Sequence, residues 1–248
     1  MDTLAQTPVT ETASKAGGKK LRRRLGTGLM VVGLVVLAWS FVVWQWNDPF
    51  TSLYTRWQQG RLATELEQIS KDEQARPLPP IETKEDAARL VRQDARAFRR
   101  RATEGSPIGR IAIPHLGLNM VVVDGTTTGT LKKGPGRHRQ TFMPGQGELI
   151  YIAGHRTTYR APFARIDRLK PGDRVSLTMP YGKFQYVVTR HTIVDDEDLS
   201  VLRTHHREVL ALQACHPRFF ATERYIVWAD LVRVVARDGT VIDIPHRA

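Results

Sequence analysis

The chain has 248 residues, with 37 Lys and Arg against 25 Asp and Glu, a net charge of +12, 41% hydrophobic residues and a single Cys. This length suits one large or two small domains, and the composition excludes collagen-like, fully disordered and multi-span membrane proteins. One Cys excludes an intramolecular disulfide and a Cys-cluster zinc site. The basic excess favours contact with anionic surfaces such as phospholipid, wall polymer or nucleic acid.

Residues 26–46 form an uncharged stretch that is long enough to cross a membrane. As a helix this stretch would rise about 31 Å, close to the thickness of the hydrocarbon layer. Five Lys and Arg residues at 19–24 precede it, and the positive-inside rule therefore predicts a cytoplasmic N-terminus and an extracytoplasmic C-terminal part. A cleaved signal peptide and a buried core helix are the alternatives. The length of the stretch and the poor cleavage site Ala38-Trp39-Ser40 favour an uncleaved anchor.

The segments around this anchor are polar. Residues 1–25 are predicted to be a disordered, basic cytoplasmic tail. Residues 47–105 are predicted to form an extracytoplasmic helical stalk, with helices at 53–74 and 84–102 that are separated by three prolines. The second helix has an apolar stripe and an arginine-rich face. We expect that face to be solvated, with contact to lipid phosphates or wall polymer as the alternative, and we expect no nucleic acid outside the cell.

From residue 106 the sequence changes to short β-type runs between Gly and Pro turns. Strands are predicted at 108–114, 120–124, 148–155, 173–179, 183–194, 208–215 and 224–235. Short helices are predicted at 163–169 and 198–203. This pattern is typical of a mostly β domain, a closed barrel or a sandwich. We place that domain at 106–236 and a C-terminal tail at 237–248.

Three residues with complementary chemistry stand at predicted strand ends. Cys215 is the single thiol and ends one strand, His155 ends another, and Arg224 begins the last strand nine residues after the Cys. A nucleophilic Cys needs an imidazole neighbour, and acyl transfer needs a cation or donor near the oxyanion. Antiparallel pairing of the last two strands would bring Arg224 beside Cys215. The simpler alternatives are a buried structural thiol, a turn histidine and an arginine that neutralises Glu223 or wall anions.

Several motifs between residues 108 and 235 resemble the sortases, the membrane-anchored cysteine transpeptidases of Gram-positive bacteria. They are IAIPHLGL at 111–118, VVDGT at 122–126, GPG at 134–136, AGHR at 153–156 and LQACHP at 212–217, followed by Arg224. The continuation AGHRTTY and the Cys-His-Pro sequence look most like the class E sortases of actinobacteria. The resemblance implies a closed eight-stranded sortase-type barrel in which Cys215, His155 and Arg224 are the catalytic residues.

The resemblance also implies a reaction and its partners. The Cys215 thiolate would attack a C-terminal sorting signal of the LAXTG or LPXTG type, His155 would act as acid and base, and Arg224 would stabilise the oxyanion. The substrates would be secreted proteins, and the acceptor an amine of a peptidoglycan precursor or of another protein. No cofactor or metal is expected, although 195–198 is a faint calcium candidate. Thr157, Tyr159 and Ala214 are weaker candidates for substrate binding.

Two features keep other functions open. Sortases usually have Thr before the Cys, and Ala214 stands there instead. A catalytically weak or inactive binding module on a sortase scaffold is therefore one alternative, and an L,D-transpeptidase is a weaker one. Asp48-Pro49-Phe50 matches the lid motif of pilus-building sortases. Because it lies next to the anchor and about sixty residues before the first strand, we interpret it as a helix stop instead.

Overall fold

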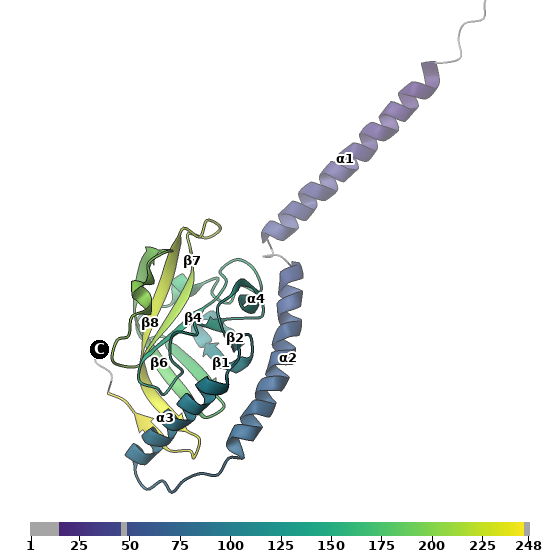
Figure 1. The fold of residues 1–248 in the computed structure, drawn as a ribbon. Helices are drawn as coiled ribbons and strands as arrows, with labels where there is room; N and C mark the ends of the chain where they lie inside the picture. Colours follow the sequence, from purple (N-terminus) through teal and green to yellow (C-terminus); the bar gives the residue numbers. More distant parts are fainter. Residues whose placement is uncertain (1–14, 46–48, 246–248) are drawn as a thin grey trace, which may run out of the picture. The chain divides into compact units, whose positions relative to one another are not determined.

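A computed structural model describes residues 15–45 and 49–245 of the chain. It divides into two compact units, Met1–Trp46 and Asn47–Ala248, which are treated separately below. The first unit is helix α1 (Lys15–Gln45) (Figure 1). One apolar window, Arg22–Phe41, is long enough to cross a membrane, and none of it is buried within the chain. This exposure decides against a buried core helix. The helix begins inside the predicted cytoplasmic tail, and Trp46 lies outside the described residues.

The second unit is built on a closed β-barrel. Its strands are β1 (Pro107–Ile113), β2 (Leu118–Asp124), β3 (Gly136–Arg137), β4 (Leu149–Ala153), β5 (Arg174–Met179), β6 (Gly182–Asp195), β7 (Val209–His216), β8 (Glu223–Ala236) and β9 (Val241–Asp243). They are hydrogen-bonded in the order β6-β5-β1-β2-β3-β4-β7-β8-β9, and an additional β6–β8 pairing closes the sheet. Within the described residues, β1 to β8 thus form the eight-stranded barrel that the resemblance implied. The β2–β3 and β4–β7 pairs are parallel and the others antiparallel.

Two of these strands were missed from the sequence. Strand β3 has only two residues and therefore carries no alternating pattern. Its Gly136 is required by packing, because a Cβ there would stand 2.1 Å from the carbonyl oxygen of Gly125. Strand β9 lies in the predicted C-terminal tail and pairs with β8 beyond the point where β7 begins. The four short helices are η1 (Pro114–Leu116), α4 (Thr128–Leu131), η2 (Ile166–Arg168) and η3 (Leu199–Leu202).

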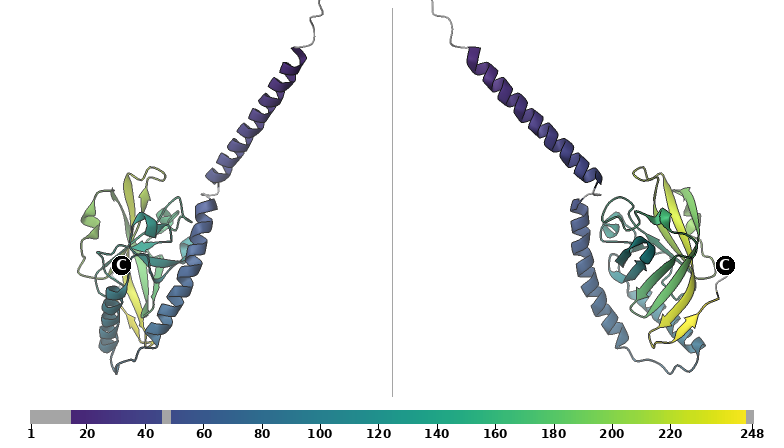
Figure 2. Two further views of the ribbon diagram at one scale, coloured as in Figure 1. Left: turned by 45° about the vertical axis from the view of Figure 1, so that its right-hand side comes forward. Right: turned by 180° about the vertical axis from the view of Figure 1, so that it is seen from behind.

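The predicted stalk is a pair of helices that pack on the barrel. Helix α2 (Pro49–Gln74) lies along β1 and β2, and helix α3 (Lys84–Arg101) crosses the barrel near β8 and β9 (Figure 2). Leu62 and Leu66 of α2 pack against Val121 and Val123. The side chain of Gln59 also bonds both the N–H and the carbonyl of Val121, at 2.7 and 3.0 Å. Because α2 buries apolar side chains against the barrel and bonds to the backbone of β2, it is part of the same domain and not a separate stalk.

The alternation of β-strand side chains gives the barrel wall two apolar faces. One face fills the interior with residues such as Ile150, Leu212, Val227 and Phe163. The opposite face carries a second set that we name the outer cluster, Leu149, Tyr151, Val209, Ala211, Ile226 and Trp228, from β4, β7 and β8. Val201 and Leu202 of η3, in the β6–β7 connection, pack against this outer cluster.

Candidate active site

The parallel β4–β7 pair brings His155 and Cys215 together. Ala153 is paired with Gln213, and the N–H of Gly154 donates to the carbonyl of Gln213 over 3.0 Å. His155 and Cys215 each follow their paired residue by two positions, so they leave neighbouring strands at the same end of the sheet. Cys215 continues the alternation of the outer cluster within β7, and His155 lies two residues beyond the end of β4. The parallel pairing of β4 and β7 therefore explains why His155 and Cys215 lie at the same end of the sheet.

The antiparallel β7–β8 pair places the third residue. Cys215 is the direct partner of Arg224 across this hairpin, as the sequence predicted. Directly opposed residues point to the same face of an antiparallel sheet. Arg224 therefore shares the outer face with Cys215, and the β4–β7 register places His155 at the same end of the sheet.

His155 is half-buried in a loop that folds back over the end of β4. The N–H of Phe163 donates to the His155 carbonyl over 3.1 Å, which closes the loop. Gly154 is required for this fold, because a Cβ at that position would lie 2.6 Å from the Phe163 ring. Burial lowers the pKa of His155, and the positive charge of Lys132 lowers it further. Its Nε2 atom is buried and has no hydrogen-bond partner among the described residues. This nitrogen therefore has unused hydrogen-bonding capacity, but no contact with solvent.

Arg224 is held in place by backbone and carboxylate acceptors. Its Nη1 atom donates to the carbonyls of Ala221 and Glu223 over 2.8 and 3.0 Å, and Nη2 lies 3.4 Å from the carboxylate of Asp196. About a quarter of the side chain, 26%, is exposed. Asp196 belongs to the acidic run that was a faint calcium candidate, and here its carboxylate forms an ion pair with Arg224. A guanidinium fixed in this way is suited to an oxyanion that develops near Cys215.

Arg156 is a site residue whose role the sequence analysis missed. Its side chain is 4% exposed, and its Nη1 atom donates to the carbonyl of Cys215 over 3.2 Å and to Nδ1 of His216 over 2.9 Å. Its Nη2 atom lies 3.2 Å from the carboxylate of Asp167. Arg156 thus joins the loop after β4 to the end of β7. Its position directly after His155, as the last residue of the AGHR motif, is the signal by which the sequence could have identified it.

The three weaker candidates have different surroundings. The Tyr159 ring lies 5.1 Å from the His155 ring, with the Lys132 ammonium 5.7 Å from the Tyr159 centroid. Thr157 is half-buried in the same loop. Ala214 is fully buried in the interior cluster and lies on the face opposite to Cys215. Its methyl group therefore belongs to the core, and this placement does not support the predicted contact between Ala214 and substrate.

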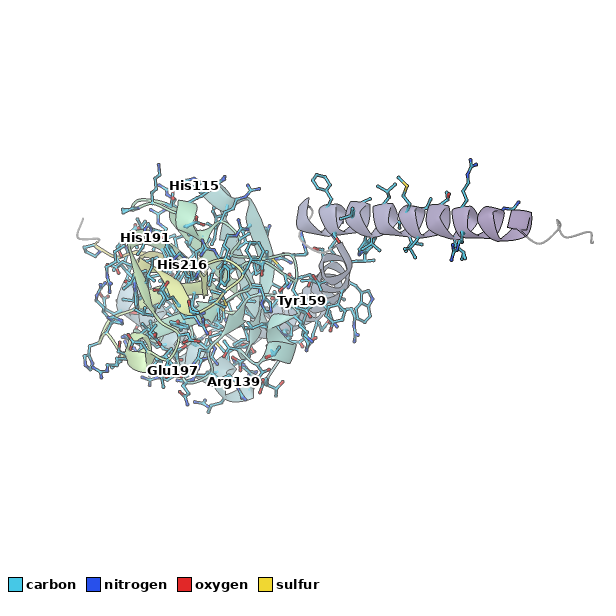
Figure 3. All side chains as sticks on the ribbon, turned by 90° about the horizontal axis from the view of Figure 1, so that it is seen from above. His115, Arg139, Tyr159, His191, Glu197 and His216 are labelled. Carbon is cyan, nitrogen blue, oxygen red and sulfur yellow. The ribbon has the colours of Figure 1, made fainter. Side chains whose placement is uncertain are left out.

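Two other contacts involve residues near the site. The ring of His205 packs 5.1 Å from that of Trp228, and burial lowers the pKa of His205. At the start of α2, Thr51 Oγ1 accepts a hydrogen bond from the N–H of Tyr159 over 3.1 Å. Tyr159 lies beside this end of α2 in Figure 3.

This contact removes the reason for placing the lid motif away from the barrel. About sixty residues separate the motif from β1, but α2 runs back along the barrel to the loop that carries His155. Asp48 itself lies outside the described residues, and so does the side chain of Phe50. The lid hypothesis therefore stays a prediction.

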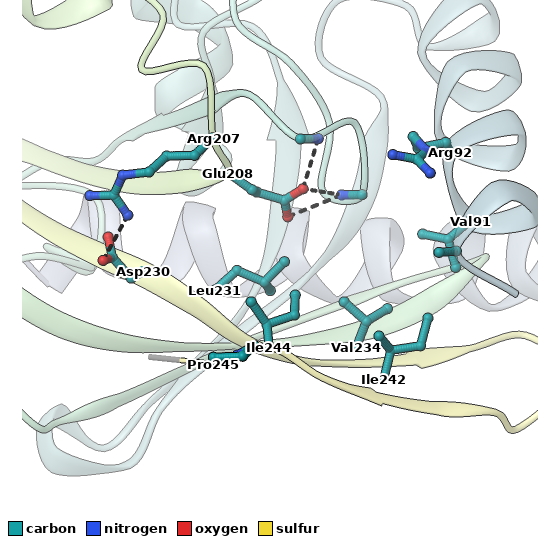
Figure 4. Close-up of a pocket in the computed structure, with 13 residues that line it drawn as sticks. Val91, Arg92, Arg207, Glu208, Asp230, Leu231, Val234, Ile242, Ile244 and Pro245 are labelled. Carbon is teal, nitrogen blue, oxygen red and sulfur yellow. Dashed lines mark hydrogen bonds and ion pairs between the residues drawn. The ribbon is translucent and has the colours of Figure 1, made fainter. Parts of the chain in front are cut away.

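A cavity of about 710 Å³ lies elsewhere, between α3, β8 and β9 (Figure 4). The carboxylate of Glu208 stands at its edge and accepts from the N–H groups of Gly145 and Gly147 and from the Tyr186 hydroxyl. Burial raises the pKa of Glu208, and these hydrogen bonds oppose that rise. Arg207 pairs with Asp230 on the same wall, at 2.7 Å. Glu208 thus fixes the loop at 143–147 to the start of β7, a structural role separate from that of Cys215.

Comparison with known proteins agrees with this geometry. A family model described as a sortase domain matches residues 111–232. Sortase D of Bacillus subtilis (strain 168) is 33% identical over 132 residues, which are 52% of this chain and 65% of that protein. The chain spans less than two thirds of the length of the curated relatives it matches.

Solved structures show the same fold. A Clostridium perfringens sortase D5 transpeptidase matches with a TM-score of 0.54 and 25% identity, over 71% of this chain and 98% of that one. Sortase E1 of Streptomyces coelicolor, solved with a tripeptide in its active site, matches with a TM-score of 0.51 and 24% identity, over 54% and 93% of the two chains. The family model and the curated relative favour the sortase family over an L,D-transpeptidase, while membership of class E stays a prediction.

Proposed function

We propose that the chain is a membrane-anchored cysteine transpeptidase of the sortase family, to which it is similar, with Cys215 as nucleophile, His155 as acid and base, and Arg224 as the oxyanion-stabilising group. The observation that carries this proposal is the convergence of two strand pairings. The antiparallel Cys215–Arg224 pair and the parallel β4–β7 register bring the three residues to the same end of the sheet.

The proposed reaction has two acyl transfers. The Cys215 thiolate attacks the carbonyl carbon of a peptide bond, the C–N bond breaks, and protonated His155 gives its proton to the departing amine. An acceptor amine then attacks the thioester, loses a proton to His155, and releases the Cys215 thiolate as the C–S bond breaks. Arg224 stabilises the oxyanion in both steps. The lowered pKa of His155 favours the neutral imidazole that the second step needs as a base.

The proposed substrates are secreted proteins with a C-terminal sorting signal, and the proposed acceptor is an amine of a peptidoglycan precursor or of another protein. From the class E resemblance we propose an LAXTG signal in preference to LPXTG. Residues 26–46 would hold the enzyme in the membrane with its N-terminus in the cytoplasm, and the domain that includes 106–236 would lie outside. Such an anchor raises the effective concentration of substrates that are held in the same membrane.

The test is to incubate the full-length chain in detergent with LAXTG and LPXTG peptides and to search for an acyl adduct on Cys215 by mass spectrometry. We expect the adduct with the wild-type chain and none with Cys215→Ala. His155→Ala and Arg224→Ala should each slow turnover by orders of magnitude, since the three groups act as a unit. A chain that forms no adduct with a wide peptide panel would instead be the inactive binding module. An Arg224→Ala chain with the native rate would remove Arg224 from the mechanism.

A further inference from the structure

A basic cavity lies beside the candidate site, outside the set of catalytic residues. It has a volume of about 680 Å³ and lies between the start of α2, the β1–β2 turn, the loop that follows β4 and the β7–β8 connection. We name it the arginine basin, because its lining includes Arg56, Arg160, Arg165, Arg168 and Arg218. All five arginines are exposed. The basin therefore presents a concentrated positive charge to the solvent.

Few negative charges offset these arginines. Among the residues whose side chains the structure describes, no acidic side chain forms an ion pair with any of the five. The acidic residue of the lining is Asp167, and its carboxylate is already bound to Arg156. The backbone at Tyr159, Arg160 and Ala161 has positive φ angles of 53°, 61° and 39°, which residues with a side chain rarely adopt. This unusual loop holds Arg160 at the basin, a feature typical of functional segments.

Two large apolar side chains project next to the basin. Phe219 and Phe220 follow Arg218 in the β7–β8 connection and are 74% and 78% exposed. The turn that carries them lies at the same end of the domain as the start of α2, in both Figure 1 and Figure 2. Exposed aromatic side chains beside a cluster of arginines are typical of a protein surface that enters the interface of a membrane.

The short chain between α1 and α2 limits how far the start of α2 can lie from the end of α1. Helix α1 ends at Gln45 and α2 begins at Pro49. The three residues between the two helices span at most about 14 Å, even when fully extended. Ser52 and Arg56 line the basin from the first two turns of α2. If α1 spans the bilayer, the basin is therefore close to its surface.

We propose that the arginine basin and the Phe219–Phe220 pair form one docking surface for a bilayer that contains anionic phospholipid. The arginines bind headgroup phosphates, and the two phenylalanines enter the interface beside them. Docking would hold the loops that follow His155 and Cys215 against the leaflet from which membrane-held substrates approach. This inference rests on the membrane anchor of the proposed function but not on the transpeptidase reaction.

An anionic wall polymer offers the same phosphate chemistry, and the bilayer is favoured by two observations. The exposed phenylalanines have no counterpart in a soluble polyanion, whereas the interface of a bilayer accommodates aromatic rings. The short connection between α1 and α2 also limits the distance between the end of α1 and the start of α2, part of which lines the basin.

The experiment measures the depth of spin labels in the full-length chain. Cys215→Ala removes the single thiol, so that a nitroxide can be attached at Thr222→Cys in the β7–β8 connection without altering either phenylalanine. Two matched labels serve as references. The label at Val36→Cys in α1 reports whether that helix is inside the bilayer, and the label at Leu78→Cys, after the far end of α2, reports full exposure to solvent. Each chain is reconstituted into phosphatidylcholine vesicles with and without phosphatidylglycerol. Collisions with oxygen and with a water-soluble nickel complex give the depth of each label.

We expect phosphatidylglycerol to shield the label at 222 severalfold from the nickel complex and to leave the label at 78 exposed. Arg160→Glu, Arg165→Glu and Arg168→Glu together should abolish this shielding. The matched control makes the same charge change on the exposed face of α3, at Arg92, Arg96 and Arg100, and should retain it. Circular dichroism checks that both triple variants are folded.

Four outcomes would overturn the proposal. If the label at 222 is accessible to the nickel complex in both lipids while the label at 36 is inside the bilayer, docking is excluded. Shielding that is equal in both lipids would show that the basin does not recognise anionic headgroups. Shielding that is equally lost in the two triple variants would show that the basin arginines have no specific part in docking. Shielding by soluble polyglycerol phosphate in phosphatidylcholine vesicles would assign the basin to wall polymer. A label at 36 that is exposed to water would instead show that the anchor of the proposed function is wrong.

Discussion

Arg156 is predicted to be a positioning residue for Cys215, and Arg156→Gln tests this role. The substitution removes a charged donor from the Cys215 carbonyl, where its bond is 3.2 Å long, and breaks the ion pair with Asp167. A hydrogen bond from a charged group contributes about 1.5–3 kcal/mol. The ion pair contributes only about 0–1 kcal/mol, because Asp167 is 48% exposed. Together these contributions predict a loss of about 2–4 kcal/mol in the free energy of unfolding.

The assay combines thermal unfolding with acylation. For a domain of this size, each kcal/mol shifts Tm by about 2–4 °C, so Arg156→Gln should lower Tm by about 4–16 °C. A displaced Cys215 should also slow adduct formation by about tenfold or more, since reacting groups need to be held within about 1 Å. Asp167→Asn is the matched control, because it removes the ion pair and leaves the bond to Cys215 in place. Equal effects of the two substitutions, or an unchanged Tm and rate in Arg156→Gln, would refute this role.

Three other predictions concern the surroundings of the site. Lys132→Met should raise the pKa of His155 towards 6.5, because it removes a nearby positive charge, but the pKa should stay below 6.5 because the imidazole remains buried. An NMR titration of labelled histidine measures this pKa, and an unchanged value would refute the prediction. Because the folded-state pKa of His155 is lowered, its stabilising contribution is present above about pH 6.5 and is lost as the pH falls towards that pKa, over a narrower window in this variant. Ala214→Thr should lower the free energy of unfolding by about 1–3 kcal/mol, because Ala214 is fully buried in the core; thermal unfolding measures this, with Ala214→Ser as the control for the hydroxyl alone. Asp48→Ala with Phe50→Ala should leave peptide cleavage unchanged in reconstituted chains, whereas a severalfold gain in rate would identify a lid.

The sequence alone determined the elements whose signals are local. An uncharged run of 21 residues indicates a membrane-spanning helix, because the hydrocarbon layer selects for length and apolarity. Short alternating runs bounded by Gly and Pro predicted seven of the barrel strands close to their observed bounds. The hairpin between β7 and β8 is also local, so the Cys215–Arg224 pair was correctly inferred from the sequence. Periodicity and turn residues carry this information within a few positions of the chain.

Only the tertiary structure decided which distant segments meet. The parallel β4–β7 register that aligns His155 with Cys215 joins strands about sixty residues apart, and no local pattern specifies it. Helix α2 looks polar in sequence, yet Gln59 bonds to the backbone of β2 and makes the predicted stalk part of the domain. The arginine basin gathers side chains from residues 56 to 218, each of which resembles an ordinary solvated arginine in the sequence. Long-range packing brings these groups together, because burial of the barrel core fixes the positions of the loops at its ends.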